Sequence, residues 1–351
     1  MANLHANLCS YHFEEALAAN SADANDCFVL DLSKDDSGNA VRSREHILEV
    51  AACCLMDLPL DMTVFTKLYV IGKWVMAYED DSLTLQEEYH RHHVEWSTVA
   101  EQMVELIETM PLLKEVTWIS DLPFTAEFLD ALPTTLTKLI VNLEQPVFPQ
   151  EGNTLSTYGK TIEPSEMTSL LDMTQLEELR LFKIPEISFQ PVVWGTVFRN
   201  KTAKGMKVLE LEMARPAVVR PGDWCLAHDV VDLDVAAGVY MAQKYKGASG
   251  NGMLDWLLGF GQYLDVRCIR KARIVADLGE GGVLPLRCLK LDGIVVDHFP
   301  FVEELSTLEL VVFSEGCVNA GLRRPSSSGS SNPIMMHWPK CAGAYQAHEG
   351  Q

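Results

Sequence analysis

The chain has 351 residues, 48% of them hydrophobic, and its 49 acidic residues outweigh 28 basic ones to give a formal net charge of −21. This content is enough for a large buried core. The acidic charge repels phosphate backbones and anionic lipid surfaces, so we expect neither nucleic acid nor a membrane as partner. The N-terminus lacks the basic and apolar stretches of a signal peptide, and the nine cysteines include no CxxC pair. These features predict a protein of the reducing cytoplasm or nucleus.

Short helices and strands alternate along most of the sequence. Residues 82–109 carry the apolar stripe of an amphipathic helix, and Met110-Pro111 ends it because the residue before a proline disfavours the α region. A strand follows almost at once, and the same order then recurs. The predicted helices are 42–57, 82–109, 125–132, 164–173, 191–200 and 252–264. The predicted strands are 28–32, 65–70, 113–118, 136–141, 176–181, 206–211, 230–235, 286–291 and 305–310.

Most of these strands carry the spacing Leu-x-x-Leu-x-Leu or an apolar variant of it. Leucine fills all three positions at 55/58/60, 176/179/181, 286/289/291 and 305/308/310, whereas chance predicts about 0.7 such triplets in this composition. The first triplet is set aside, because Pro59 lies inside it and suits the end of a helix better than a strand. Residues two apart in a strand share a face, so the last two leucines point inward together and the first turns in from the preceding loop. One helix–strand unit cannot bury its apolar face alone, and stacked units solve this by sharing a core.

The pattern predicts an α/β fold, namely an irregular leucine-rich-repeat solenoid with a curved parallel sheet and helices on its outer side. The solenoid would span 27–318, after an N-terminal segment at 1–26 that is weakly ordered or caps the sheet. Residues 319–351 include a run of serine, glycine and proline and are expected to form a disordered, low-complexity tail. The alternative is an open, doubly wound α/β sheet, in which helices and strands also alternate.

No group of residues has the spacing of a catalytic or metal site. His90 and His93 share a helix face and could bind zinc with a distant third ligand, but the acidic residues around them are typical of a solvated face. The glycines at 247–252 and 279–282 lack the lysine and hydroxyl residue of a phosphate-binding loop. We therefore expect no catalytic residue, cofactor or metal, and a protein that is not an enzyme. In the doubly wound alternative, an active site would lie near residues 247–252 and His228.

The strand face opposite the leucines is the candidate partner-binding surface, because solenoids commonly bind proteins along their inner sheet. Its side chains carry both signs of charge, which fits a protein partner better than a nucleic acid. The candidate residues are Tyr69, Lys138, Arg180, Glu210, Asp234, Lys290 and Glu309. A merely solvated sheet is the other interpretation of this face.

The succession of helix, Met110-Pro111 and Leu113…Val116…Trp118 resembles the degenerate leucine-rich proteins of filamentous fungi, many of which are F-box-like subunits of ubiquitin ligases. The resemblance covers roughly 28–318. It implies a non-catalytic protein–protein interaction module that serves as a substrate-recognition subunit. Too few residues precede the first strand to hold an F-box, and Leu58-Pro59 comes too late in the sequence to open one. The sequence identifies neither the protein partner nor the oligomeric state.

Overall fold

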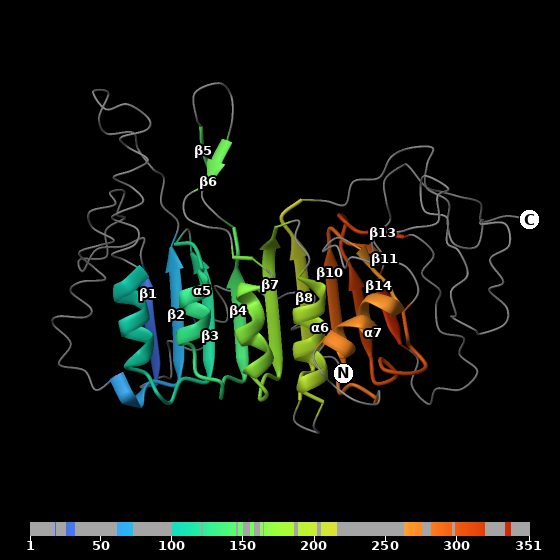
Figure 1. Cartoon of the computed structure of the whole chain (residues 1–351), viewed down its shortest axis with the longest axis horizontal. Coiled ribbons are helices and arrows are strands. Elements are labelled where there is room, and N and C mark those ends of the chain that lie inside the picture. The colour runs from blue at the N-terminus through green and yellow to red at the C-terminus, as the bar shows by residue number, and fades with distance from the viewer. Residues whose placement is uncertain are drawn as a thin grey trace, which may run out of the picture. The chain divides into compact units, whose positions relative to one another are not determined.

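In the part of the chain that the structure describes, the main sheet of this α/β protein contains nine parallel strands (Figure 1). Contacts divide the chain into two compact units, one formed by Tyr11–Pro185 and the other containing Glu186–Gln351, named here the N-terminal and the C-terminal unit. The computed structural model describes residues 18, 26–31, 62–72, 100–120, 122–144, 147–149, 155–157, 162–163, 165–185, 189–201, 205–215, 263–275, 282–296, 299–319 and 334–337.

The N-terminal unit contributes five neighbouring strands whose order follows the chain. They are β1 (Cys27–Asp31), β2 (Lys67–Gly72), β3 (Glu115–Ser120), β4 (Lys138–Asn142) and β7 (Glu178–Ile184). Each of them pairs in parallel with the next. A separate antiparallel pair is made by β5 (Val147–Pro149) and β6 (Leu155–Thr157).

The C-terminal unit contributes four strands, again in chain order. They are β8 (Val208–Met213), β10 (Cys288–Asp292), β12 (Leu310–Phe313) and β14 (Met335–His337). A second, three-stranded sheet has the order β13-β11-β9 and consists of β9 (Tyr263–Leu264), β11 (Val295–Val296) and β13 (Val318–Asn319). Two strands of the main sheet, β10 and β12, are therefore each followed within a few residues by a two-residue strand of this second sheet.

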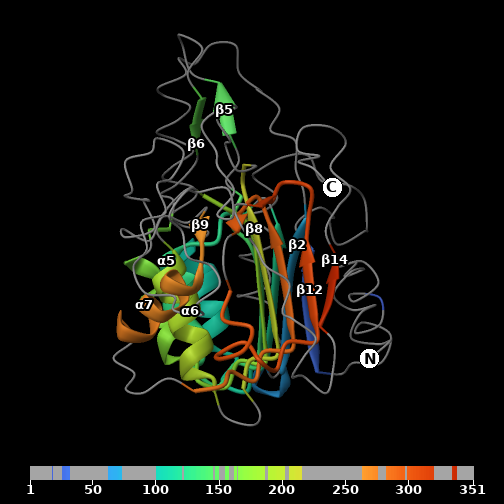
Figure 2. The same cartoon turned by 90° about the vertical axis from the view of Figure 1, so that its right-hand side faces the viewer.

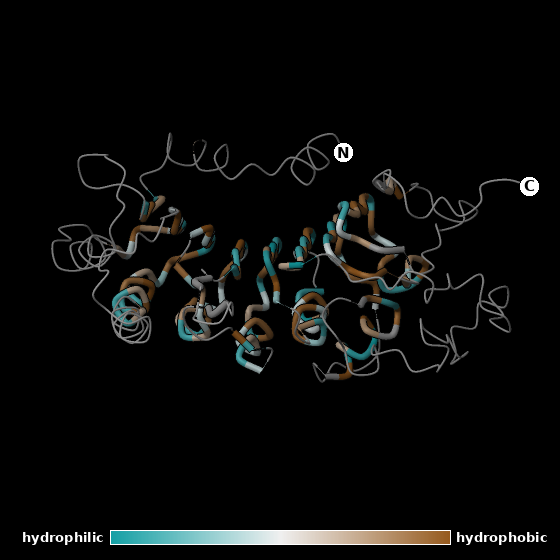
Figure 3. The backbone as a smooth tube through the Cα atoms, turned by 90° about the horizontal axis from the view of Figure 1, so that it is seen from above, coloured by the Kyte–Doolittle hydropathy of each residue, from teal (hydrophilic) through white to brown (hydrophobic). Residues whose placement is uncertain are grey.

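In each unit the helices lie on one face of the strands (Figure 2; Figure 3). The N-terminal unit has helical residues 100–108, α5 (Ala126–Ala131) and the 3-10 helices η1 (Met62–Val64) and η2 (Glu166–Asp172). The C-terminal unit has α6 (Gln190–Arg199) and α7 (Val266–Val275), which pack against each other. Asp265 begins α7, since its Oδ1 accepts a hydrogen bond of 2.7 Å from the amide of Cys268.

Aliphatic side chains from successive strands line up on the helix-covered face. In the N-terminal unit the strand register joins Leu68, Val116, Leu139 and Leu179 in one row, and none is more than 1% exposed. The C-terminal unit repeats this arrangement with Leu209, Leu289 and Val311, all fully buried. Each unit therefore builds its interior from the inward positions of the predicted leucine spacing.

The start of most described strands of the main sheet repeats one main-chain arrangement. The amides of Lys114 and Glu115 both donate to the carbonyl oxygen of Thr66, at 2.7 and 3.0 Å. The amides of Thr137 and Lys138 donate in the same way to Lys114 O. We call such an oxygen a strand-entry carbonyl. The other described strand-entry carbonyls belong to Asp26, Thr137, Lys207 and Arg287.

Most of the predicted strands are confirmed, and their starts lie within two residues of the prediction except at 305–310. There, Leu305 lies in a turn and Leu308 in the irregular segment that follows, and the strand comprises Leu310–Phe313. Leu310 pairs with Cys288, so it belongs to the face opposite the helices and packs in a small cluster with Cys288, Val208 and Val312. The inward positions of this strand are Val311 and Phe313 instead.

Four other expectations need correction or lie outside the described residues. The helix predicted at 252–264 is wrong where it can be compared, because Tyr263–Leu264 is strand β9 and the helix follows as α7. Within the predicted disordered tail, Met335–His337 forms β14 and pairs with β12. The predicted helix at 42–57 and strand at 230–235 lie outside the described residues.

The strand order also differs from that of a doubly wound sheet. Such a sheet reverses its strand order at a switch point, where its ligands bind. Within each unit, the described strands follow the chain without a reversal. Both folds considered from the sequence, the solenoid and the doubly wound sheet, belong to the parallel α/β class. The order of the described strands is not that of a doubly wound sheet.

Candidate functional site

On the face opposite the helices, the N-terminal unit carries a row of alternating charges across four neighbouring strands. The register joins Lys67 to Glu115, Glu115 to Lys138 and Lys138 to Glu178. We call these four residues the charged row. Each occupies the position just before the second leucine of the spacing, at the beginning of its strand. About one-fifth of the side chain is exposed for Lys67, Lys138 and Glu178.

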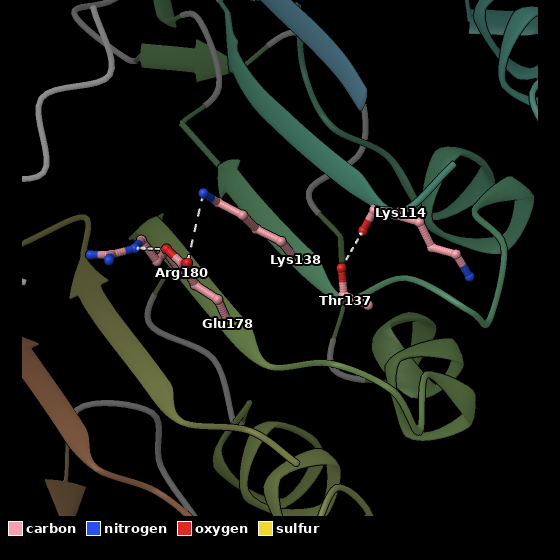
Figure 4. A network of polar contacts seen from close by, with 5 residues as sticks. All are labelled: Lys114, Thr137, Lys138, Glu178 and Arg180. Atoms are coloured by element: carbon pink, nitrogen blue, oxygen red, sulfur yellow. Dashed lines mark hydrogen bonds and ion pairs between the residues drawn. The ribbon is translucent and has the colours of Figure 1, made fainter. Parts of the chain in front are cut away.

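Ion pairs connect the charged row to itself and to its neighbours (Figure 4). Lys138 Nζ lies 3.7 Å from Glu178 Oε2, and Arg180 Nε lies 2.5 Å from Glu178 Oε1. Glu178 therefore faces one cation of its own strand and one of the neighbouring strand. Thr137 donates a hydrogen bond of 3.1 Å through its hydroxyl to Lys114 O, which fixes the entry to β4 beside this pair.

At the other end of the row, Lys67 Nζ lies 3.8 Å from Asp26 Oδ2. The Thr66 hydroxyl donates to the same carboxylate oxygen at 2.6 Å. This hydrogen bond, assisted by the Lys67 ammonium, holds the pKa of the exposed Asp26 carboxyl below its usual value. The row is thus bounded by a carboxylate that stays ionised at neutral pH.

The next row along the same strands is buried. The register joins Tyr69, Thr117, Ile140 and Arg180, and none of these is more than 2% exposed. Two of the predicted partner-binding residues, Tyr69 and Arg180, are in this row, so their side chains do not meet solvent. Lys138 is half-buried in the charged row and remains within reach of a partner. A buried ionised group needs a partner of opposite charge, and Glu178 provides it for Arg180.

The C-terminal unit places its predicted residues differently. Lys290 Nζ lies 2.7 Å from Glu210 Oε1, with Glu210 almost fully buried and Lys290 about one-quarter exposed. Glu309 precedes β12 and accepts a hydrogen bond of 2.8 Å from Arg287 Nε. Asp234 lies outside the described residues. The structure therefore brings two of the predicted residues, Glu210 and Lys290, into direct contact.

The candidates predicted from the sequence include Lys138 of the charged row but not Lys67, Glu115 or Glu178. The signal was present, because Glu115 stands at the same place in the leucine spacing as Lys67, Lys138 and Glu178. Reading that one position across successive strands gives alternating signs. The prediction considered each strand by itself, so it did not include the order of charges across strands.

A second ionic cluster connects α7 to the turns at 301–307. Arg270 Nε lies 3.1 Å and Arg273 Nη1 lies 3.7 Å from Glu304 Oε1, and Arg270 also pairs with Glu303. Glu304 is only 5% exposed. The amide of Leu284 donates to Glu304 O at 2.8 Å, so the cluster joins three segments of the C-terminal unit. Its place within the fold indicates a stabilising role.

Other residues singled out in the sequence lie outside the described residues, namely His90, His93, His228 and the glycines at 247–252. Within the described ranges, no three residues among histidine, cysteine, aspartate and glutamate are grouped so as to hold a metal ion. The helices in this part of the chain are all too short or too polar to cross a bilayer.

Burial determines the chemistry of the cysteines. It raises the pKa of the Cys317 thiol to about 12 and also raises the pKa of the Cys268 thiol. Both thiols are therefore protonated at neutral pH, and in that form they are poor nucleophiles.

Comparison with protein-family models, with curated proteins and with solved structures found no match to this chain.

Proposed function

We propose that this chain is a non-catalytic protein-binding scaffold, built as an irregular leucine-rich solenoid, which contacts its partner through the charged row of the N-terminal unit. The observation that carries the proposal is the register of the strands, which aligns four charged side chains on one face of four neighbouring parallel strands. Stacked strand units that share a core characteristically present such a continuous surface.

The solenoid architecture is supported by repetition at three levels. The strands follow chain order in each unit, the inward positions carry aliphatic side chains in register, and the strand-entry carbonyls recur from strand to strand. The resemblance to fungal F-box-like proteins suggests a substrate-recognition subunit of a ubiquitin ligase as the biological setting. That setting rests on the resemblance, whereas the binding surface rests on the geometry.

The test compares proteins captured by the full chain and by a charge-swapped variant, Lys67→Glu/Glu115→Lys. This variant keeps the net charge and leaves the Glu178–Arg180 pair in place. Partner capture, quantified by mass spectrometry, should fall about 5- to 30-fold, which corresponds to a loss of about 1–2 kcal/mol of binding free energy. Reversal of Arg180 is a poorer test, because a buried charge would be left without its partner.

The matched control is Glu105→Lys/Lys201→Glu. Both residues are exposed and lie outside the strands, and the exchange again keeps the net charge. Capture by this control should equal that of the unmodified chain. Recovery of no protein partner by the unmodified chain, or equal capture by all three forms, would overturn the proposal.

A further inference from the structure

The charged row has a fixed spacing as well as an alternating sign. Neighbouring strands of a sheet lie about 4.8 Å apart, so the four side chains of the row, from Lys67 to Glu178, extend over about 14 Å. Their signs are plus, minus, plus and minus across β2, β3, β4 and β7. A complementary surface must therefore alternate in sign at nearly the same interval.

This alternation decides between classes of partner. A polyanion such as a nucleic acid, or a uniformly basic peptide, would meet a like charge at every second strand, and like charges in contact are destabilising. A partner with alternating acidic and basic side chains meets an opposite charge at each of the four positions. The row thus selects a polypeptide with mixed charge.

The distance between neighbouring charges in the row distinguishes an extended partner segment from a helical one. Side chains on one face of an extended strand are about 6.7 Å apart, so three intervals cover about 20 Å and miss the end of the row by about 6 Å. Side chains one turn apart on a helix are about 5.4 Å apart, so three turns cover about 16 Å. The helix stays within about 2 Å of the row over its whole length, which flexible lysine and glutamate side chains readily accommodate.

From this match, and on the basis of the proposed function, we infer that the charged row is the docking site for an α-helix of a partner protein. The helix lies across the strands and carries acidic and basic residues in alternation at positions i, i+4, i+7 and i+11. An acidic residue meets Lys67 and Lys138, and a basic residue meets Glu115 and Glu178. The row of side chains beside this contact, which contains Ile140, is buried and offers the partner no surface. The helix therefore reaches the charged row through its own long charged side chains.

The experiment uses display libraries as the probe and the full chain as bait. One library presents 16-residue helical peptides with glutamate or lysine at positions i, i+4, i+7 and i+11. A second presents extended peptides with the same choice at i, i+2, i+4 and i+6. The unmodified chain should enrich the helical order Glu-Lys-Glu-Lys, or its reverse, at least about tenfold over four like charges, a ratio that corresponds to about 1.4 kcal/mol.

The charge-swapped variant Lys67→Glu/Glu115→Lys should change this preference to Lys-Glu-Glu-Lys, which reads the same in both directions. Circular dichroism of the variant establishes that it is folded. Enrichment of extended peptides, absence of any enrichment, or an unchanged preference in the variant would overturn the helix inference. If any of these occurs while capture of natural partners still depends on the charged row, the proposed function stands and the helix inference alone fails.

Discussion

Gly293, directly after β10, is held in a conformation that only glycine adopts readily. Its φ is +69°, and an added Cβ would lie 2.7 Å from Met213 Cβ and 2.8 Å from Arg215 O. An L-residue in the left-handed region costs about 1–2 kcal/mol, and overlap within a packed region costs about 1–3 kcal/mol. Gly293→Ala should therefore lower the free energy of unfolding of the C-terminal unit by about 2–4 kcal/mol, after a small gain from the stiffer unfolded chain.

The measurement is hydrogen exchange followed by mass spectrometry across a urea series. Peptides that cover β8 and β10 report on the C-terminal unit, and peptides that cover β3 and β4 serve as an internal reference. Exchange in β8 and β10 should begin at lower urea in the variant, because these strands surround the substituted residue.

Gly282→Ala is the matched control. An added Cβ there meets nothing within 4 Å, so the free energy of unfolding should change by less than about 0.5 kcal/mol. Equal stabilities of the Gly293→Ala and Gly282→Ala variants would refute the argument from backbone conformation and contact with Met213. So would a loss in Gly293→Ala of less than about 1 kcal/mol.

Two further predictions concern buried polar groups. Arg180→Leu should destabilise the N-terminal unit by about 2–3 kcal/mol in urea denaturation. This loss is below the range for a fully buried pair, because Glu178 keeps its ion pair with Lys138 and is partly exposed to solvent. An increase in stability would contradict the prediction. Above about pH 9 the unfolded chain ionises its thiols, whereas the buried Cys317 thiol stays protonated until about pH 12. The unfolded state then binds fewer protons, so stability should fall with pH over this window by up to about 1.4 kcal/mol per unit for each such thiol. The slope should be shallower in Cys317→Ala, and an identical slope would argue against burial as the cause.

The leucine spacing predicted the positions of the strands because it reports a physical requirement that is local. Leu179 and Leu181 point inward together, and Leu176 reaches the same interior from the loop before them, all three with at most 2% exposure. Alternation along a strand is enough to indicate which side chains are inward. It also indicates that the strands need neighbours to cover that face.

The leucine spacing placed the strand too early at 305–310, because two apolar patterns overlap in this segment. Leu308, Val311 and Phe313 satisfy the apolar pattern as well as the three leucines do, three residues further on. The Thr307 hydroxyl donates to Leu286 O at 2.9 Å, which fixes the preceding turn and selects the later pattern. Leucine identity alone could not reveal this contact with a distant segment.

The sequence predicted neither α7 nor the burial of Tyr69 and Arg180, and the two reasons differ. The apolar stripe of α7 is short, with Cys268, Ile269 and Ala272 buried and partly exposed basic residues beside it, although Asp265 before it is an ordinary helix start. Burial of Tyr69 and Arg180 on the face opposite the helices depends on what covers that face, and alternation within one strand does not contain that information.

The strand-entry carbonyls make the joint between successive strands mainly a matter of main-chain atoms. Two amide hydrogens and one oxygen suffice, so any residue except proline can occupy the donor positions, as the variety of Lys114, Thr137 and Arg287 illustrates. The intervals between entries, from residue 67 to 115, then to 138 and to 178, differ widely. The connecting segments can therefore change in length and sequence during evolution while the strands keep their pairing. Such changes remove sequence similarity between related proteins sooner than similarity of fold.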